Sequence, residues 1–184
     1  AAIVAHEGPC YLRLGRSGEP SIHPANVDFE LGKAIRVREG RDLTLIAAGG
    51  MLGNVLRAAE ILADRGIQSR VLSMHTIKPL DGGAVLSAAR ETSAIFTVEE
   101  HSVVGGLGAA VAEMRRGTIE DGGEGPIVSV GGIVEQKGGI AIDRRTQDHA
   151  VKAGIAVIPD LGVADVMRGA LWAISKHERI GLGL

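Results

Sequence analysis

Aromatic residues are scarce in this chain of 184 residues, where they make up 2%. The hydrophobic fraction of 45% still allows a sizeable core, which must be built mainly from aliphatic side chains. The shortage also removes the stacking platforms that proteins use to bind single-stranded nucleic acid. Acidic and basic residues are intermixed, with a formal net charge of −2, so we expect no basic stripe for nucleic acid or for an anionic membrane.

Cysteine is limited to Cys10, which excludes an internal disulfide and a zinc site built on cysteines. Cys10 lies in an apolar segment, and we expect it to be a core residue rather than a nucleophile. No hydrophobic run approaches the roughly 18 residues of a membrane span, and the sequence shows no signal peptide. These absences favour a protein of the reducing cytoplasm.

The first residues of the chain read as the end of a structure that began earlier. The chain starts at Ala1 rather than at methionine, and we favour a cut inside a larger protein over a processed or disordered N-terminus. Residues 10–14, CYLRL, predict a short strand after the break at Gly8 and Pro9. The next 25 or so residues lack periodicity and predict a linker, which a short strand at 34–38 could close.

From Asp42 onward, strand and helix patterns alternate. The predicted strands cover residues 42–50, 68–77, 93–101 and 126–134. The predicted helices cover residues 52–63, with Gly66 as a C-terminal cap, and 84–91, with Asp81 as an N-terminal cap. A third helix follows a glycine turn within residues 105–117, and two more cover residues 145–153 and 163–175. This alternation predicts an α/β fold of three layers, α/β/α, around a mostly parallel sheet.

Polar residues gather where the third strand of this pattern ends, which is where α/β sheets usually bind ligands. Glu99, Glu100 and His101 could act as acids, bases or metal ligands. Neighbours on a strand point to opposite faces, so Glu99 and His101 could share a site, with His75 as a further metal ligand. We favour the alternative that this strand end makes hydrogen bonds across an interface.

A glycine-rich turn follows, and Gly105, Gly106 and Gly108 lead into the next helix. Such a turn is also found in dinucleotide-binding folds, but there it follows the first strand and precedes an acidic residue about 20 positions later. This chain does not follow that arrangement. We favour the interpretation that these glycines let the helix pack closely on the sheet or against a partner.

Two arginines flank the end of the first predicted strand. Arg13 and Arg16 lie next to Gly15 and Gly18, and an arginine beside flexible backbone amides can hold an oxyanion or a phosphate. A solvated or salt-bridged pair of arginines explains the pattern equally well. The residues alone leave both possibilities open.

Several of these segments together resemble the transketolase family. GPCYLRLGR resembles the last strand of its pyrimidine-binding domain, and residues 42–81 resemble the opening of its C-terminal domain. VEEHSVVGGLGAAVAE resembles the third strand and following turn of that domain. The order and spacing of TIKPLD, EEH and GGLG carry the resemblance, which extends from Gly8 to Ile174. Among the related thiamine enzymes, the sequence most resembles the separate C-terminal section of split transketolases.

The resemblance implies a domain organisation and a divided active site. Residues 1–20 would be the remnant of a pyrimidine-binding domain, 21–41 a linker, 42–177 the C-terminal domain and 178–184 a tail. Thiamine diphosphate and magnesium would bind segments absent from this sequence, which has neither the GDG-type motif nor the catalytic glutamate. Arg16 matches an arginine that holds the sugar phosphate, whereas Glu100, His101 and the three glycines would lie near an interface.

Two hypotheses about function follow. In the first, the chain is the C-terminal section of a transketolase-type enzyme, inactive alone, which assembles with an N-terminal section or as a homo-oligomer. The equivalent part of deoxyxylulose phosphate synthase or of a 2-oxo acid dehydrogenase beta subunit is a variant of this hypothesis. In the second, the chain is a structural module that dimerises or binds a partner without taking part in catalysis.

Overall fold

The chain folds around one six-stranded sheet in a computed structural model that describes residues 2–15, 20–101, 105–116, 127–132 and 155–157. The strands are β1 (Ile35–Arg38), β2 (Leu43–Ala47), β3 (Ser69–Ser73), β4 (Ile95–Glu100), β5 (Ile127–Gly132) and β6 (Ile155–Val157). Their order is β1-β3-β2-β4-β5-β6, and each neighbouring pair is parallel except the antiparallel pair of β1 and β3. The predicted α/β fold with a mostly parallel sheet is confirmed, and β6 is a strand that the sequence pattern missed.

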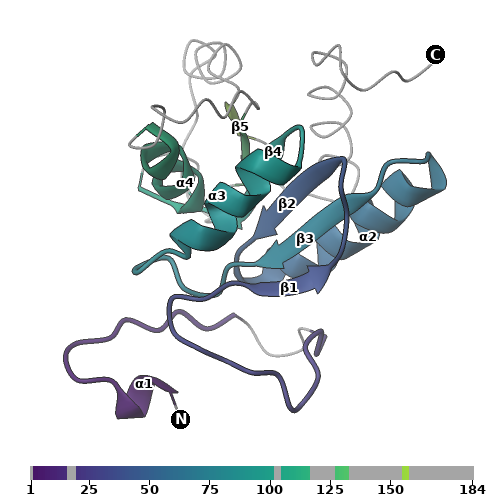
Figure 1. Ribbon diagram of the computed structural model, residues 1–184. Coiled ribbons are helices and arrows are strands. Elements are labelled where there is room, and N and C mark those ends of the chain that lie inside the picture. Colours follow the sequence, from purple (N-terminus) through teal and green to yellow (C-terminus); the bar gives the residue numbers. More distant parts are fainter. Residues whose placement is uncertain (1, 16–19, 102–104, 117–126, 133–154, 158–184) are drawn as a thin grey trace, which may run out of the picture.

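Helices cover both faces of the sheet (Figure 1). The described helices are α1 (Ala2–Ala5), which lies away from the sheet, a short 3-10 helix η1 (Gly49–Met51), α2 (Leu52–Asp64), α3 (Gly82–Glu91) and α4 (Leu107–Arg116). Figure 1 shows α2 on one face and both α3 and α4 on the other, so the three predicted layers are confirmed. The predicted helices at 145–153 and 163–175 lie outside the described residues. Among the described helices, none is long and apolar enough to cross a membrane.

Strand β2 supplies the centre of the core, and all five of its residues are buried. Leu45 belongs to the apolar cluster under α2, whereas its neighbour Ile46 belongs to the cluster under α3 and α4. A strand buried on both faces is what an uninterrupted apolar run predicts, because helices cover a parallel sheet on each side. Among the described residues, Phe96 of β4 is the largest fully buried side chain, and it lies in the α2 cluster.

The predicted helix boundaries are confirmed where a local signal set them. Gly66 has a φ of +81° and donates its backbone N–H to the carbonyl of Ala63, at 2.9 Å, just past the end of α2. Glycine suits this position because a left-handed backbone crowds any Cβ atom. At the start of α3, the Asp81 carboxylate accepts a hydrogen bond from the Ala84 N–H at 3.0 Å.

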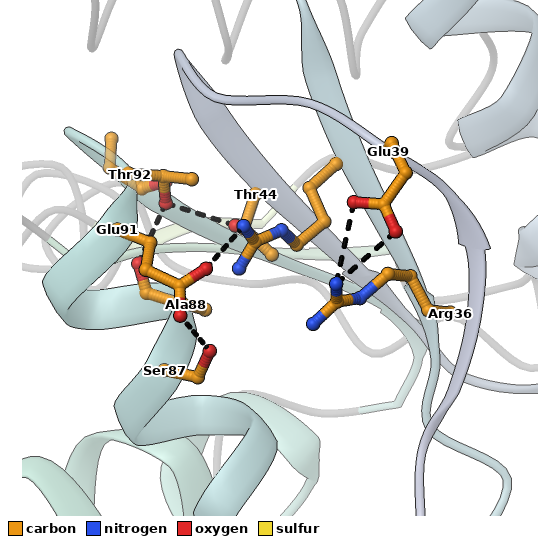
Figure 2. Close-up of polar contacts among 9 residues, drawn as sticks. Arg36, Glu39, Thr44, Ser87, Ala88, Glu91 and Thr92 are labelled. Carbon is orange, nitrogen blue, oxygen red and sulfur yellow. Dashed lines mark hydrogen bonds and ion pairs between the residues drawn. The ribbon is translucent and has the colours of Figure 1, made fainter.

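One buried charge lies at the edge of the α3 layer. The Arg70 side chain is 7% exposed, and its guanidinium donates to the Glu91 carboxylate at 2.6 Å. Figure 2 shows this carboxylate also receiving the Ser87 hydroxyl, with Arg36 and Glu39 paired nearby. The Ser87 hydrogen bond and the Arg70 guanidinium lower the pKa of Glu91. Arg70 is thus a buried charge that is neutralised within the chain.

The N-terminal segment departs from two predictions. Residues 10–14 form no strand, and Cys10 is exposed rather than part of the core. Both differences have one cause: in the part of the chain that the structure describes, no strand pairs with this segment and no helix covers it. Its apolar side chains are exposed instead, with Tyr11 at 91%, Leu14 at 77% and Leu12 at 58%.

Candidate functional site at the carboxyl ends of the strands

Glu99 is buried at the carboxyl end of β4 and caps helix α4. The residue as a whole is only 8% exposed. Its two carboxylate oxygens accept hydrogen bonds from the backbone N–H groups of Leu107, at 2.7 Å, and Gly108, at 2.9 Å. These are among the first N–H groups of α4, which have no partner inside the helix and which carry its positive end. A strand residue eight positions away thus does the work of an N-terminal cap.

The glycine turn is shaped by this carboxylate. A Cβ atom built on Gly106 would lie 2.5 Å from each Glu99 carboxylate oxygen, a distance at which something must move. Gly105 has a φ of +79°, a left-handed conformation that glycine adopts without strain. Gly106 and Gly108 are buried inside this chain, whereas Gly105 is exposed. Close packing of helix on sheet, the interpretation we favoured, accounts for Gly106.

The hydrogen bonds of Glu99 to α4 bear on the chemical roles that we considered for the end of β4. A phosphate at the N-terminus of α4 would need the N–H groups that Glu99 already occupies, so the geometry argues against dinucleotide binding there. Each Glu99 oxygen accepts one hydrogen bond within the fold, so the structure gives this carboxylate a structural role. The described residues contain no group of three or more His, Cys, Asp or Glu side chains that could hold a metal.

Glu100 points away from the core, and His101 follows it at the surface. Both residues are exposed, in contrast to buried Glu99. Alternation along β4 accounts for Glu100, whereas His101 lies beyond the end of the strand and does not share the face of Glu99 as we expected. The backbone carbonyl of Glu100 accepts a hydrogen bond from Arg13 at 3.1 Å, which joins the N-terminal segment to the end of β4. Arg13 is therefore committed to a main-chain contact. Arg16, the predicted phosphate-holding residue, lies outside the described residues.

The predicted linker is held against the end of β3. His23 Nε2 lies 3.2 Å from the hydroxyl of Ser73, the last residue of that strand. The ring of Phe29 packs on the ring of His75, with centroids 4.1 Å apart and planes tilted by 31°. Ile22 adds an apolar contact to the cluster under α2. We call this set of contacts, between residues 22–34 and the loop 73–81, the linker dock.

The linker dock continues into the TIKPLD motif. Gly32 has a φ of +80°, and a Cβ atom there would lie 2.9 Å from the Pro79 ring. Asp81 accepts the backbone N–H of Ala34 on Oδ2, at 2.8 Å, while its other oxygen caps α3. One carboxylate therefore fastens both the end of the linker and the start of a helix. Strand β1 follows directly and joins the sheet edge beside β3.

The dock gives His75 an unusual environment. Nδ1 lies 2.8 Å from the Thr76 hydroxyl, whereas Nε2 is buried without a hydrogen-bond partner in the described structure. Burial lowers the pKa of His75, and nearby His23 lowers it further, while the main-chain carbonyl of Lys33 opposes the shift. On balance these surroundings lower the pKa of His75 and so disfavour its charged form.

Sequence reasoning placed His75 at a strand end but missed its partners on the linker. Nothing in the sequence between residues 20 and 33 shows which linker side chains face which end of the sheet. Two signals were available in retrospect: an aromatic residue, Phe29, in a chain with few of them, and a second histidine, His23, within the linker. The carboxyl edge of β3 and β4 is therefore occupied by the chain's own linker and its own helix cap.

Comparison with known proteins adds a family context. Residues 32–139 match the family described as transketolase, C-terminal domain. The chain is 50% identical over 111 residues to the 6-deoxy-6-sulfo-D-fructose transketolase subunit SqwH of Clostridium sp. strain MSTE9, which covers 60% of this chain and 34% of the relative. It is 33% identical over 191 residues to the 1-deoxy-D-xylulose-5-phosphate synthase of Thermomicrobium roseum, which covers 99% of this chain and 27% of the relative.

A solved structure shares the fold. It is described as a split gene transketolase in an inactive beta4 tetramer, and it matches with a TM-score of 0.74 at 38% identity. The match covers 95% of this chain and 54% of that chain. The chain spans about a third of the length of the curated relatives described above.

Proposed function

Since the chain belongs to the transketolase family, through that family's C-terminal domain, we propose that it is the C-terminal section of a transketolase-type thiamine diphosphate enzyme. The whole enzyme would transfer a two-carbon ketol unit between sugar phosphates in the cytoplasm. This section would support the fold and the oligomer and would be inactive alone. Thiamine diphosphate and magnesium would bind segments supplied from elsewhere.

The observation that carries this proposal is the filled carboxyl edge of the sheet. In α/β folds, ligands usually bind beyond the carboxyl ends of the strands. Here the linker dock covers the end of β3, and Glu99 occupies the helix terminus at the end of β4. An edge satisfied by the chain's own groups suits a supporting domain better than one that binds a cofactor itself.

The exposed N-terminal segment supports the assignment of residues 1–20 to a preceding domain. Tyr11, Leu12 and Leu14 are apolar side chains on a segment without a sheet of its own. Burying such side chains is favourable by about 1.5–3 kcal/mol each, so a partner that covers them would gain affinity. We propose that this partner is the domain, or the separate N-terminal section, that binds the cofactor.

Reconstitution tests the proposed function. We expect co-expression with an N-terminal section that carries the GDG-type motif to give a complex on gel filtration and ketol transfer between sugar phosphates. The double variant Tyr11→Ser/Leu14→Ser should weaken the complex, whereas Ile61→Ser, at an exposed apolar residue of α2 outside the N-terminal segment, should leave it intact. A chain that neither forms a complex nor restores activity would refute the proposal.

Three further outcomes test the alternatives and the placement of the cofactor site. Formation of 1-deoxy-D-xylulose 5-phosphate by the assembled enzyme would identify the chain as the matching part of that synthase, to which its relative from Thermomicrobium roseum belongs. Complex formation without any activity would favour a purely structural module. Tight binding of thiamine diphosphate and magnesium by the isolated chain, measured by calorimetry, would contradict our placement of the cofactor site on other segments.

Arg16 remains the residue that we propose for substrate binding in the assembled enzyme. A guanidinium can contact a phosphate dianion through two parallel hydrogen bonds. We expect Arg16→Ala to raise KM for phosphorylated sugars by about tenfold, with a smaller change in kcat, because binding energy is lost in the ground state as well as in the transition state. Arg41→Ala, at an exposed arginine far along the linker, is the control. An unchanged KM in the Arg16 variant would exclude this role.

A further inference from the structure

The large apolar side chains that are exposed concentrate on the N-terminal segment, residues 2–15. Four of the six that are exposed in the described part of the chain lie there, namely Val4, Tyr11, Leu12 and Leu14. Apolar side chains gathered on one segment, beside a domain whose core is otherwise closed, indicate a surface that another protein or domain covers.

This segment lies outside the C-terminal domain of the family. The family match covers residues 32–139, yet the synthase of Thermomicrobium roseum aligns with 99% of this chain, a stretch that makes up 27% of the synthase. Residues 2–15 therefore correspond to a part of that relative which precedes the C-terminal domain. What covers the segment is thus expected to be the preceding part of the enzyme, which under the proposed function binds the cofactor.

One hydrogen bond ties the N-terminal segment to the sheet. Arg13 donates to the main-chain carbonyl of Glu100 at 3.1 Å, at the exposed carboxyl end of β4. A single hydrogen bond shifts an equilibrium between an attached and a free state by about two- to tenfold. That is too little to order the whole segment against its conformational entropy. Arg13 therefore needs a second attachment that keeps it close to Glu100.

The linker dock supplies the second attachment. Ile22 packs against the apolar cluster under α2, Phe29 stacks on His75 with the ring centroids 4.1 Å apart, and the Ala34 N–H donates to Asp81 at 2.8 Å. Several contacts that act together hold the linker more firmly than one hydrogen bond holds the segment. Since Ile22 follows Arg13 closely in the chain, the docked linker raises the effective concentration of the guanidinium at the end of β4.

We propose that the linker dock and Arg13 form a double anchor, which holds the apolar N-terminal segment in a defined position for the cofactor-binding part of the enzyme to cover. The anchor is a property of this chain, whereas the identity of the partner rests on the proposed function. Arg13 acts as a positioning residue, because it contacts the main chain of the domain. A segment that is ordered in advance loses less conformational entropy when its partner binds, so the anchor strengthens assembly.

A spin label on Cys10 tests the anchor in the chain alone. Cys10 is the single cysteine of the chain and is exposed, so a nitroxide attached to it reports the mobility of the segment. Ile22→Ser/Phe29→Ser, which weakens the dock without changing the segment, should raise the mobile fraction by about threefold or more. Arg13→Met should do the same, and Arg13→Lys, which keeps a donor, should restore order. Ile61→Ser, at an exposed apolar residue of α2, should change nothing.

A second dock variant separates loss of the anchor from a loss of folding. Gly32→Ala would place a Cβ atom 2.9 Å from the Pro79 ring, on a backbone with a φ of +80°, and so disturbs the dock without removing a core side chain. It should mobilise the label as the first variant does, while hydrogen exchange of the β2 and β3 amides stays slow and shows that the domain is folded. A label that is equally mobile in the unmodified chain and in both dock variants would overturn the anchor.

Binding kinetics with the N-terminal section used for reconstitution test what the anchor does. The dock variants should lower the association rate constant by about threefold and leave the dissociation rate constant nearly unchanged, because a smaller fraction of chains is competent to bind. Equal association rate constants would overturn the role of the anchor in assembly and leave the proposed function intact. Absence of a complex with the unmodified chain would refute the proposed function and the partner named here. Self-association that Tyr11→Ser/Leu14→Ser abolishes would overturn that partner in favour of a second copy.

Discussion

Gly40→Ala is expected to destabilise the chain by about 3 kcal/mol, although it adds one methyl group. A Cβ atom at Gly40 would lie 2.1 Å from the Ser69 carbonyl carbon and 2.2 Å from the Arg70 amide nitrogen. Both are main-chain atoms of β3, so relief of the clash must move a strand rather than turn a side chain. The movement would also disturb the Arg41 and Asp42 amides, which both donate to the Gln68 carbonyl.

Gly53→Ala is the matched control for Gly40. It makes the same chemical change within helix α2, where the added Cβ atom would meet only the Ile22 side chain, at an ordinary 3.6 Å. Alanine is preferred over glycine inside helices by about 1 kcal/mol, so this variant should be more stable than the unmodified chain. Urea unfolding of both variants measures the difference, and equal stabilities would contradict the close approach at Gly40.

Glu99→Ala is expected to lower the free energy of unfolding by a similar amount, about 3 kcal/mol. The substitution removes two charge-assisted hydrogen bonds and leaves the backbone N–H groups of Leu107 and Gly108 buried without a partner. Hydrogen exchange should show the loss as faster exchange at these two amides, in the first turn of α4. Glu100→Ala, at the exposed neighbour, should change the free energy of unfolding by less than about 0.5 kcal/mol.

A double-mutant cycle with Gly106→Ala tests the contact itself. Alone, Gly106→Ala should destabilise by about 2 kcal/mol, because its Cβ atom would collide with the carboxylate of Glu99. In the Glu99→Ala background that carboxylate is gone, so the second substitution should cost far less, and the two effects should not add. Additive effects would show that Glu99 and Gly106 act independently and would refute the proposed origin of the glycine.

Local signals in the sequence were sufficient for most elements of the fold. The apolar run of β2, the helical spacing of α2, Gly66 past its end and Asp81 before α3 each act through neighbours a few residues away. Short-range hydrogen bonds and side-chain periodicity are physical properties of the segment itself. The prediction of a strand at 10–14 was wrong for the opposite reason. A strand needs a neighbouring strand to pair with, and no local pattern guarantees one.

The candidate site depended on contacts between distant segments. Glu99 was recognisable as an acidic residue at a strand end, but its role as a cap for α4 depends on how the turn brings Leu107 back over the strand. Likewise, His75 and Phe29 lie 46 positions apart in the sequence and meet only because the linker folds across the end of β3. Side-chain chemistry suggested acids and metal ligands, whereas packing gave Glu99 a structural role as the cap of α4.

By itself, the sequence determined an aliphatic α/β domain, its mostly parallel sheet and its resemblance to one family, because composition, periodicity and short motifs are local properties. Tertiary structure alone decided that Cys10 is exposed, that Glu99 is occupied inside the fold and that the linker is fastened to the domain through His23 and His75. The reason is physical: burial and hydrogen-bond partners are set by which segments meet, and the carboxyl edge of a sheet brings together residues far apart in the chain.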